Sequence, residues 1–256
     1  LIKSSTYLSR LGFMDMNQSV TALTSVMKGF RIEAADSMDI VDKLTQLDAK
    51  YATTAGDIAT ALSRTSAVAR EAGLNLDQTA AALTTMIDVS QQDASSVGNA
   101  FRTILARYGN VKAGAFTSLV GDSDDIEDAN ASINDTEKVL GAIGIKVRSS
   151  AGDMRDFYDV MEELAEIYPT LDEVTRNAVA TALGGTRQRN LLSIMIQNWD
   201  QVKESQEEAE KAQGTAAAKM AAYNESIEFS IQRLSTAWES FSQKLAVDPV
   251  VKGAFE

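Results

Sequence analysis

The residues that could do chemistry in this chain are carboxylates, because cysteine and histidine are both absent from its 256 residues. Their absence excludes disulfides, thiol nucleophiles, imidazole bases and nearly every zinc or transition-metal site. Paired Asp and Glu residues could in principle cleave a glycoside. No such pair stands out from the solvated faces of the expected helices, so the sequence predicts no catalytic residue, no cofactor and no enzymatic activity.

The densest group of carboxylates is the run GDSDDIED at residues 121–128. A calcium loop of the EF-hand type beginning at Asp122 requires glycine at its sixth position and a bidentate acid at its twelfth. Glu127 and Ile133 occupy those positions. The spacing therefore favours a solvated acidic loop over a metal site, and no metal ligand is predicted.

A second polar group follows two adjacent glycines in the sequence LGGTRQ at residues 183–188. Arg187 and Arg189 could bind an anion at the start of a helix. The alternative, that they bind carbonyls or carboxylates of neighbouring loops, is the more common role of such arginines and is favoured. The segment is also expected to form a sharp structural turn, made by Gly184, Gly185, Thr186 and Arg187.

Composition restricts the elements that position these groups. Two prolines in the whole chain, together with many good helix formers, indicate an all-α fold. The formal net charge of −12 argues against nucleic-acid binding, because no excess of Lys and Arg can displace phosphate counterions. No run of about 18 apolar residues is present, so no membrane span is expected. Since Leu1 is not a start residue, the chain is expected to be a fragment of a longer one.

Residues 1–110 are expected to be a block of stacked short helical hairpins. Residues 57–72 carry one apolar stripe at helical spacing, and Gly73 follows where a left-handed residue would end the helix. Asn75 with Gln78, and then Asp93, supply caps for the next two helices. Asn17 or Ser19 is expected to cap a helix that ends at residue 30, whereas residues 1–16 show no clear pattern.

Three further parts are predicted after this block. Residues 111–135 form an acidic irregular insert, and residues 136–200 form a second helical block with a small β-hairpin near 145–155. In this block Asp153 is expected to cap one helix, and Thr170 with Glu173 to form the capping box of the next. Residues 201–256 are predicted to be a charged linker followed by a long helix.

The long helix, from residue 215 to about 245, has apolar residues at gaps of three and four, close to a coiled-coil heptad with one stutter. Packing against the preceding helices and contact with a partner or a second copy are both consistent with this spacing. We refer to these residues as the α-stripe: Met220, Tyr223, Ile227, Ile231, Leu234, Trp238, Phe241 and Leu245.

Short motifs over most of residues 30–245 resemble, in order, the conserved core of phage tail tape measure proteins. They are residues 30–36 (FRIEAAD), 41–44 (VDKL), 57–62 (DIATAL), 72–79 (AGLNLDQT), 97–104 (VGNAFRTI), 140–148 (LGAIGIKVR), 152–157 (GDMRDF) and 183–188 (LGGTRQ). The last two are the most specific. The acidic insert departs from the family's usual pattern.

The resemblance implies a structural protein of the virion that lies in the lumen of the tail tube. Such proteins act as assembly scaffolds that set tail length and leave ahead of the genome during ejection. The implied partners are other copies of the chain, expected as a trimer, together with tail tube subunits, distal tip or baseplate hub proteins and tail assembly chaperones. Assembly would occur in the host cytoplasm, and regions outside this fragment could contact the host membrane.

An alternative function is that of a bacterial helical-bundle adaptor or signalling scaffold, since such bundles are also rich in Ala, Ser and Gln. They have long unbroken heptads. Here the expected helices stop about every 15 residues at glycine, which favours the tail protein.

Overall fold

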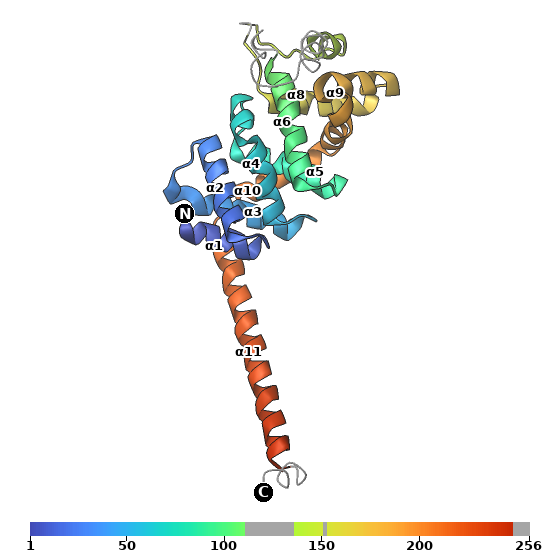
Figure 1. Ribbon diagram of the computed structural model, residues 1–256. Helices are drawn as coiled ribbons and strands as arrows, with labels where there is room; N and C mark the ends of the chain where they lie inside the picture. Colours follow the sequence, from blue (N-terminus) through green and yellow to red (C-terminus); the bar gives the residue numbers. More distant parts are fainter. Residues whose placement is uncertain (111–135, 151–152, 248–256) are drawn as a thin grey trace. The chain divides into compact units, whose positions relative to one another are not determined.

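The computed structural model describes residues 1–110, 136–150 and 153–247, and the side chains of these residues except for residue 110 and those beyond 236 (Figure 1). The described residues are mostly helical and contain no β-strand, so the predicted all-α fold is confirmed. Two compact units are present, Leu1–Ala216 and Ala217–Glu256. The predicted four-part division of the chain stays a prediction.

The first half of the larger unit is a series of helices joined by short turns. They are α1 (Ile2–Leu11), α2 (Met16–Phe30), the 3-10 helix η1 (Ala34–Asp36), α3 (Ser37–Lys50), α4 (Ala55–Glu71), α5 (Leu76–Ser90) and α6 (Ala94–Asn110). Residues 136–142 are also helical. The later elements are α8 (Phe157–Ile167), the 3-10 helix η3 (Tyr168–Thr170), α9 (Glu173–Gln197), α10 (Trp199–Glu210) and α11 (Thr215–Val247).

Helix α4 is the centre of the larger unit, where it packs against α1, α2, α3, α5 and α6. Its predicted stripe is buried at Ile58, Ala61, Leu62, Thr65 and Ala69. Because five helices cover α4, its small side chains set how closely those helices approach.

Glycines allow two close approaches to α4. A Cβ added to Gly98 of α6 would lie 2.7 Å from the carbonyl oxygen of Ala61 in α4. A Cβ added to Gly29 of α2 would lie 2.2 Å from the Ser66 hydroxyl, also in α4. Helices α2 and α6 therefore each contact α4 at a glycine, which has no side chain to keep the backbones apart.

Aromatic residues join α6 to α8. The Tyr108 ring lies edge-on to Phe157 with 5.2 Å between ring centroids, and Phe101 lies 6.0 Å from Phe157. The Tyr108 hydroxyl donates to the carbonyl oxygen of Arg155 at 2.7 Å, so the one polar atom of this buried ring is satisfied.

The predicted caps at α5 and α6 are confirmed. Asn75 and Gln78 form a capping box in which each side chain accepts from the other residue's backbone N–H. Asp93 accepts from the backbone N–H of Ser96 at 3.0 Å. Gly73 ends α4 with φ 90°, the left-handed conformation expected there.

Other local predictions were wrong. Residues 1–16 contain α1, and the cap of α2 is Asp15 rather than Asn17 or Ser19. Helix α1 was missed because it buries small residues such as Ser4 and Ser5, which hydrophobic periodicity cannot register. The cap of α2 was misplaced because Asp, Asn and Ser are all favourable N-cap residues and lie within five positions of one another.

The capping predictions in the second half were also wrong. Helix α8 begins at Phe157, so Asp153 is too early to cap it. Helix α9 is capped by Asp172, which accepts from the N–H of Thr175, rather than by Thr170. The predicted hairpin is reduced to one isolated antiparallel bridge between Arg148 and Met154.

Candidate functional site

The start of α11 is held by a carboxylate from a distant helix. Asp42 of α3 is 6% exposed and accepts from the backbone N–H of Gly214 and of Ala216, each at 2.9 Å. The Thr215 hydroxyl lies 3.1 Å from the Oε1 of Gln46, again in α3. A buried negative charge thus satisfies N–H groups that every helix leaves unpaired in its first turn. Gly214 and Ala216, the last residues of the larger unit, are therefore held by α3.

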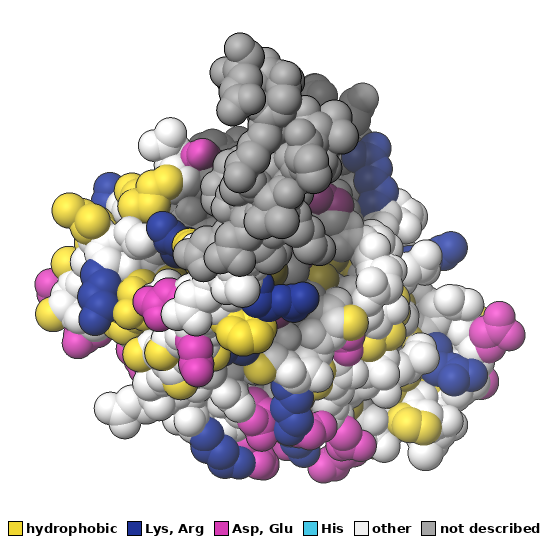
Figure 2. Space-filling model, turned by 90° about the horizontal axis from the view of Figure 1, so that it is seen from below, with side chains coloured by type: hydrophobic (Ala, Val, Ile, Leu, Met, Phe, Trp, Pro, Cys, Tyr) yellow, Lys and Arg dark blue, Asp and Glu magenta, His cyan; other side chains and the backbone are white. Residues whose placement is uncertain are grey.

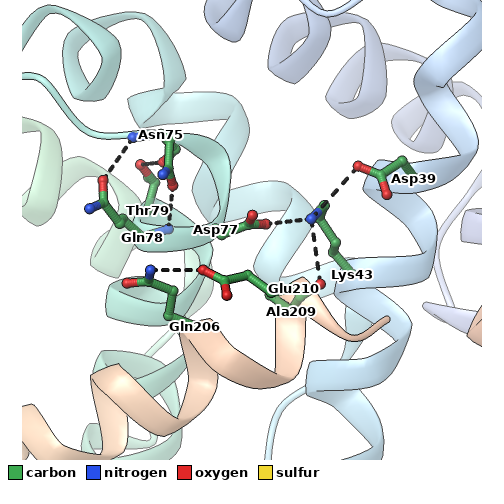
Figure 3. A network of polar contacts seen from close by, with 9 residues as sticks. All are labelled: Asp39, Lys43, Asn75, Asp77, Gln78, Thr79, Gln206, Ala209 and Glu210. Atoms are coloured by element: carbon green, nitrogen blue, oxygen red, sulfur yellow. Dashed lines mark hydrogen bonds and ion pairs between the residues drawn. The ribbon is translucent and has the colours of Figure 1, made fainter. Parts of the chain in front are cut away.

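A largely buried lysine, Lys43, contacts residues of α3, α5 and α10 (Figure 3). The Nζ of Lys43 in α3 lies 2.8 Å from Asp77 of α5 and 3.7 Å from Asp39 of its own helix. It also donates to the carbonyl oxygen of Ala209 in α10 at 3.4 Å. Its side chain is 12% exposed, so these contacts form largely out of water. Lys43 therefore ties the end of α10 to α3 and α5.

Two more groups fasten α10 along its length. Lys50 pairs with Glu204 and Glu208 at 2.8 and 3.0 Å, and hydrogen bonds to these carboxylates raise the pKa of Lys50. A hydrogen bond from Gln46, and then one from Lys50, lowers the pKa of Glu208. Helix α10 thus contacts its neighbours through charged side chains that flank a buried strip made of Trp199, Val202, Ser205 and Ala209.

The α-stripe lies on α11, where much of it is open to solvent. Ile231 is 61% exposed and Leu234 72% exposed. Tyr223 is 38% exposed, Ile227 is half-buried and Met220 is buried. Ile231 and Leu234, at heptad spacing, therefore form an apolar face that no described side chain buries. The side chains of the remaining stripe residues, Trp238, Phe241 and Leu245, lie outside the described part.

One exposed aromatic on α11 does not belong to the α-stripe. Phe229 is 61% exposed and its ring lies 6.0 Å from the Arg233 guanidinium carbon. Successive residues of an α-helix are rotated by about 100°, so the Phe229 side chain lies on the opposite side of α11 from Ile227 and Ile231. Its position as an isolated aromatic on a polar face was the sequence signal that could have identified it.

The two-glycine segment interrupts α9. Gly185 has φ 65° and ψ 178°, a conformation that only glycine adopts readily, and α9 is kinked there. A Cβ on Gly185 would lie 2.9 Å from the Arg107 guanidinium of α6. Gly184 and Gly185 are buried, whereas Thr186, Arg187 and Arg189 are exposed. The two exposed arginines are not gathered into an enclosed anion site.

Charged side chains of both signs are interspersed on the face shown in Figure 2, where hydrophobic side chains gather toward the left-hand side. No group of three or more acidic residues able to hold a metal ion occurs among the described residues. The acidic run 121–128 lies outside them. No helix in the described part is long and apolar enough to cross a membrane.

Residues 1–185 match the family of phage-related minor tail proteins. The chain belongs to this family. The match ends at the α9 kink, so α10 and α11 of this minor tail protein lie beyond it. Membership makes the chain a structural component associated with the phage tail. No solved structure matches this minor tail protein.

Proposed function

We propose that this minor tail protein is a segment of a tail tape measure protein. It lies in the tail tube, acts as the scaffold that sets tail length, and is released when the genome is ejected. The unit Leu1–Ala216 is the anchoring head that tip or baseplate hub proteins hold, and α11 begins the extended part. The chain carries out no reaction in this role.

The observation that carries the proposal is the fixed start and exposed face of α11. Asp42 holds the first turn, while Ile231 and Leu234 remain 61% and 72% exposed. Burying each such side chain is worth about 1.5–3 kcal/mol. A helix built in this way gains stability by bundling, which supports association with other copies, taken to be three.

Charge supports a place in a lumen through which DNA passes. The net charge of −12 repels the phosphate backbone and keeps non-specific DNA binding weak. Tail tube subunits, tip proteins and assembly chaperones are the partners expected in this setting.

Tail length measured by electron microscopy tests the proposal. An insertion of about 28 helical residues, which keeps the heptad, placed after Glu228 of α11 is expected to lengthen tails by about 42 Å, at about 1.5 Å per residue. The same insertion in the exposed turn after Gln91, between α5 and α6, is the matched control and should leave the length unchanged. This turn belongs to the folded head, so residues added there do not extend the rod.

Two results would contradict the proposal. Tails of unchanged length with both insertions would favour the adaptor or signalling scaffold. Equal lengthening with both insertions would show that the unit Leu1–Ala216 also contributes to tail length, which would contradict its proposed role as the anchoring head.

A further inference from the structure

Phe13 is an unusual residue in the turn between α1 and α2. It is 84% exposed, the most exposed of the large apolar side chains in the described part of the chain. Its φ of 53° places it in the left-handed region, where a bulky residue is strained. The side chain is thus held in a costly backbone conformation and gains little burial in return.

The left-handed conformation itself has a local explanation. The N–H of Met14 donates to the carbonyl oxygen of Ser9 at 3.1 Å. This is the hydrogen bond of the Schellman motif at a helix C-terminus, in which the residue before the donor, here Phe13, adopts the left-handed conformation. The same bond ends α4, from Leu74 to Ala69, and there the left-handed residue is Gly73. Glycine would serve equally well at position 13, so helix termination does not account for phenylalanine.

Phe13 lines an open groove of about 700 Å³ between α2 and α4. The groove has a floor of bare backbone, because Gly12 and Gly56 approach so closely that a Cβ on Gly12 would lie 2.6 Å from the Gly56 nitrogen. A groove of this volume fits a small molecule or a few residues of extended peptide, and is too small for the face of a helix.

Unpaired polar groups line the same groove. The side chains of Asn17, Thr21, Arg64 and Ser95 make no hydrogen bond or ion pair within the described part of the chain. They supply an amide, two hydroxyls and a guanidinium, so the lining offers both donors and acceptors. A peptide backbone, with one N–H and one C=O per residue, matches such a mixture.

The lining carries one positive and one negative side chain, Arg64 and Asp57, which form no ion pair with each other. Asp57 keeps its charge and accepts a hydrogen bond from the Thr54 hydroxyl at 2.7 Å, whereas Arg64 makes no hydrogen bond or ion pair within the described part of the chain. A guanidinium binds a carboxylate through two parallel hydrogen bonds. The groove therefore suits a ligand that places one carboxylate at Arg64, away from Asp57, and an apolar group that can cover Phe13.

We propose that this groove binds a short, extended acidic peptide segment of another tail protein. Arg64 binds its carboxylate, Phe13 packs against an apolar side chain, and Asn17, Thr21 and Ser95 bind its backbone. A nucleic acid is disfavoured because one arginine cannot neutralise a run of phosphates. The proposal rests on membership of the tail protein family and does not depend on the tape measure role.

An array of about 12-residue peptides, tiled over the tail proteins encoded with this chain, tests the site. The full chain should bind a subset with acidic and apolar residues close together. R64E should weaken binding of these peptides about ten- to hundredfold, as expected for loss of a hydrogen bond to a charged group. R102E, a change of an exposed arginine on α6 outside the groove, is the matched control and should bind as the unmodified chain does.

Phe13→Gly separates binding from folding. Because glycine adopts the left-handed conformation freely, this variant should weaken peptide binding and yet raise the thermal unfolding midpoint by about 2–4 °C. A fall in the midpoint would show that Phe13 is structural and would overturn its role. Absence of any peptide sensitive to R64E would overturn the proposal, as would binding of chitohexaose, a neutral oligosaccharide, that depends on Phe13 and not on Arg64.

Discussion

Gly98 is the residue of α6 at which an added Cβ would meet the backbone of α4. In Gly98→Ala the added Cβ would lie 2.7 Å from the carbonyl oxygen of Ala61 and 2.9 Å from its Cα. Backbone atoms cannot move aside as a flexible side chain can, so we expect a loss of about 1–3 kcal/mol in the free energy of unfolding. Chemical denaturation followed by circular dichroism measures it.

The control for this change lies on the same helix. A Cβ on Gly109 meets nothing within 4 Å. Gly109→Ala should therefore leave the stability of the fold unchanged or raise it by up to about 1 kcal/mol, because alanine favours the helix. Equal losses in both variants would show that helix propensity rather than close packing dominates in α6.

The roles of residues that interact only with residues close in sequence could be predicted. The Asn75–Gln78 capping box and the left-handed Gly73 depend on three or four residues, and both are present. Asp42 could not be predicted in this way. Its partners Gly214 and Ala216 follow it by more than 170 positions. Only the packing of α3 against the end of α10 brings these groups together.

At the scale of elements, strongly patterned helices such as α4 were predicted and weakly patterned ones were not. Helix α10 lies in a segment expected to be a charged linker. Its buried side chains are Trp199, Val202, Ser205 and Ala209, and only the first of these, at the start of the helix, is large, so no apolar stripe stands out. Charged contacts to Lys43 and Lys50 hold it instead. In the candidate site, the spacing of the α-stripe could be predicted from the sequence, but the hydrogen bonds from Gly214 and Ala216 to Asp42 could not.

Helix α11 carries a prediction at the same scale. If the α-stripe bundles copies of the chain, replacing both Ile231 and Leu234 with Gln should lower the association constant by at least about a hundredfold, since each exposed side chain contributes about 1.5–3 kcal/mol when buried. Sedimentation equilibrium measures this constant. Phe229→Gln changes an equally exposed residue on the other side of the helix and should leave association unchanged. A chain that stays monomeric, or equal loss in both variants, would refute bundling through this face.

At the scale of the whole molecule, charge sets how stability depends on pH. Cysteine and histidine are absent, so no side chain has an ordinary pKa between about 4.5 and 10. A hydrogen bond from Arg155 lowers the pKa of Glu163, and the backbone N–H of Thr175 lowers that of Asp172. A carboxylate whose pKa is lowered by folding stabilises the fold above its unfolded pKa, and this contribution is lost as the pH falls through the folded value. Acid destabilisation should begin only below about pH 4.5.

The alkaline limit has a different origin. Burial raises the pKa of Tyr158 to about 12, where its ring packs 4.9 Å from that of Trp199. An unfolded tyrosine ionises near pH 10, so this contribution is complete below about pH 10 and is lost as the pH rises toward the folded value. Thermal unfolding midpoints should therefore be flat from about pH 6 to 9 and fall on both sides. Tyr158→Phe removes the ionisable hydroxyl and should lessen the alkaline fall while leaving the acid one unchanged. A step between pH 6 and 8 would contradict this account, because it would require a titrating group that the described side chains do not provide.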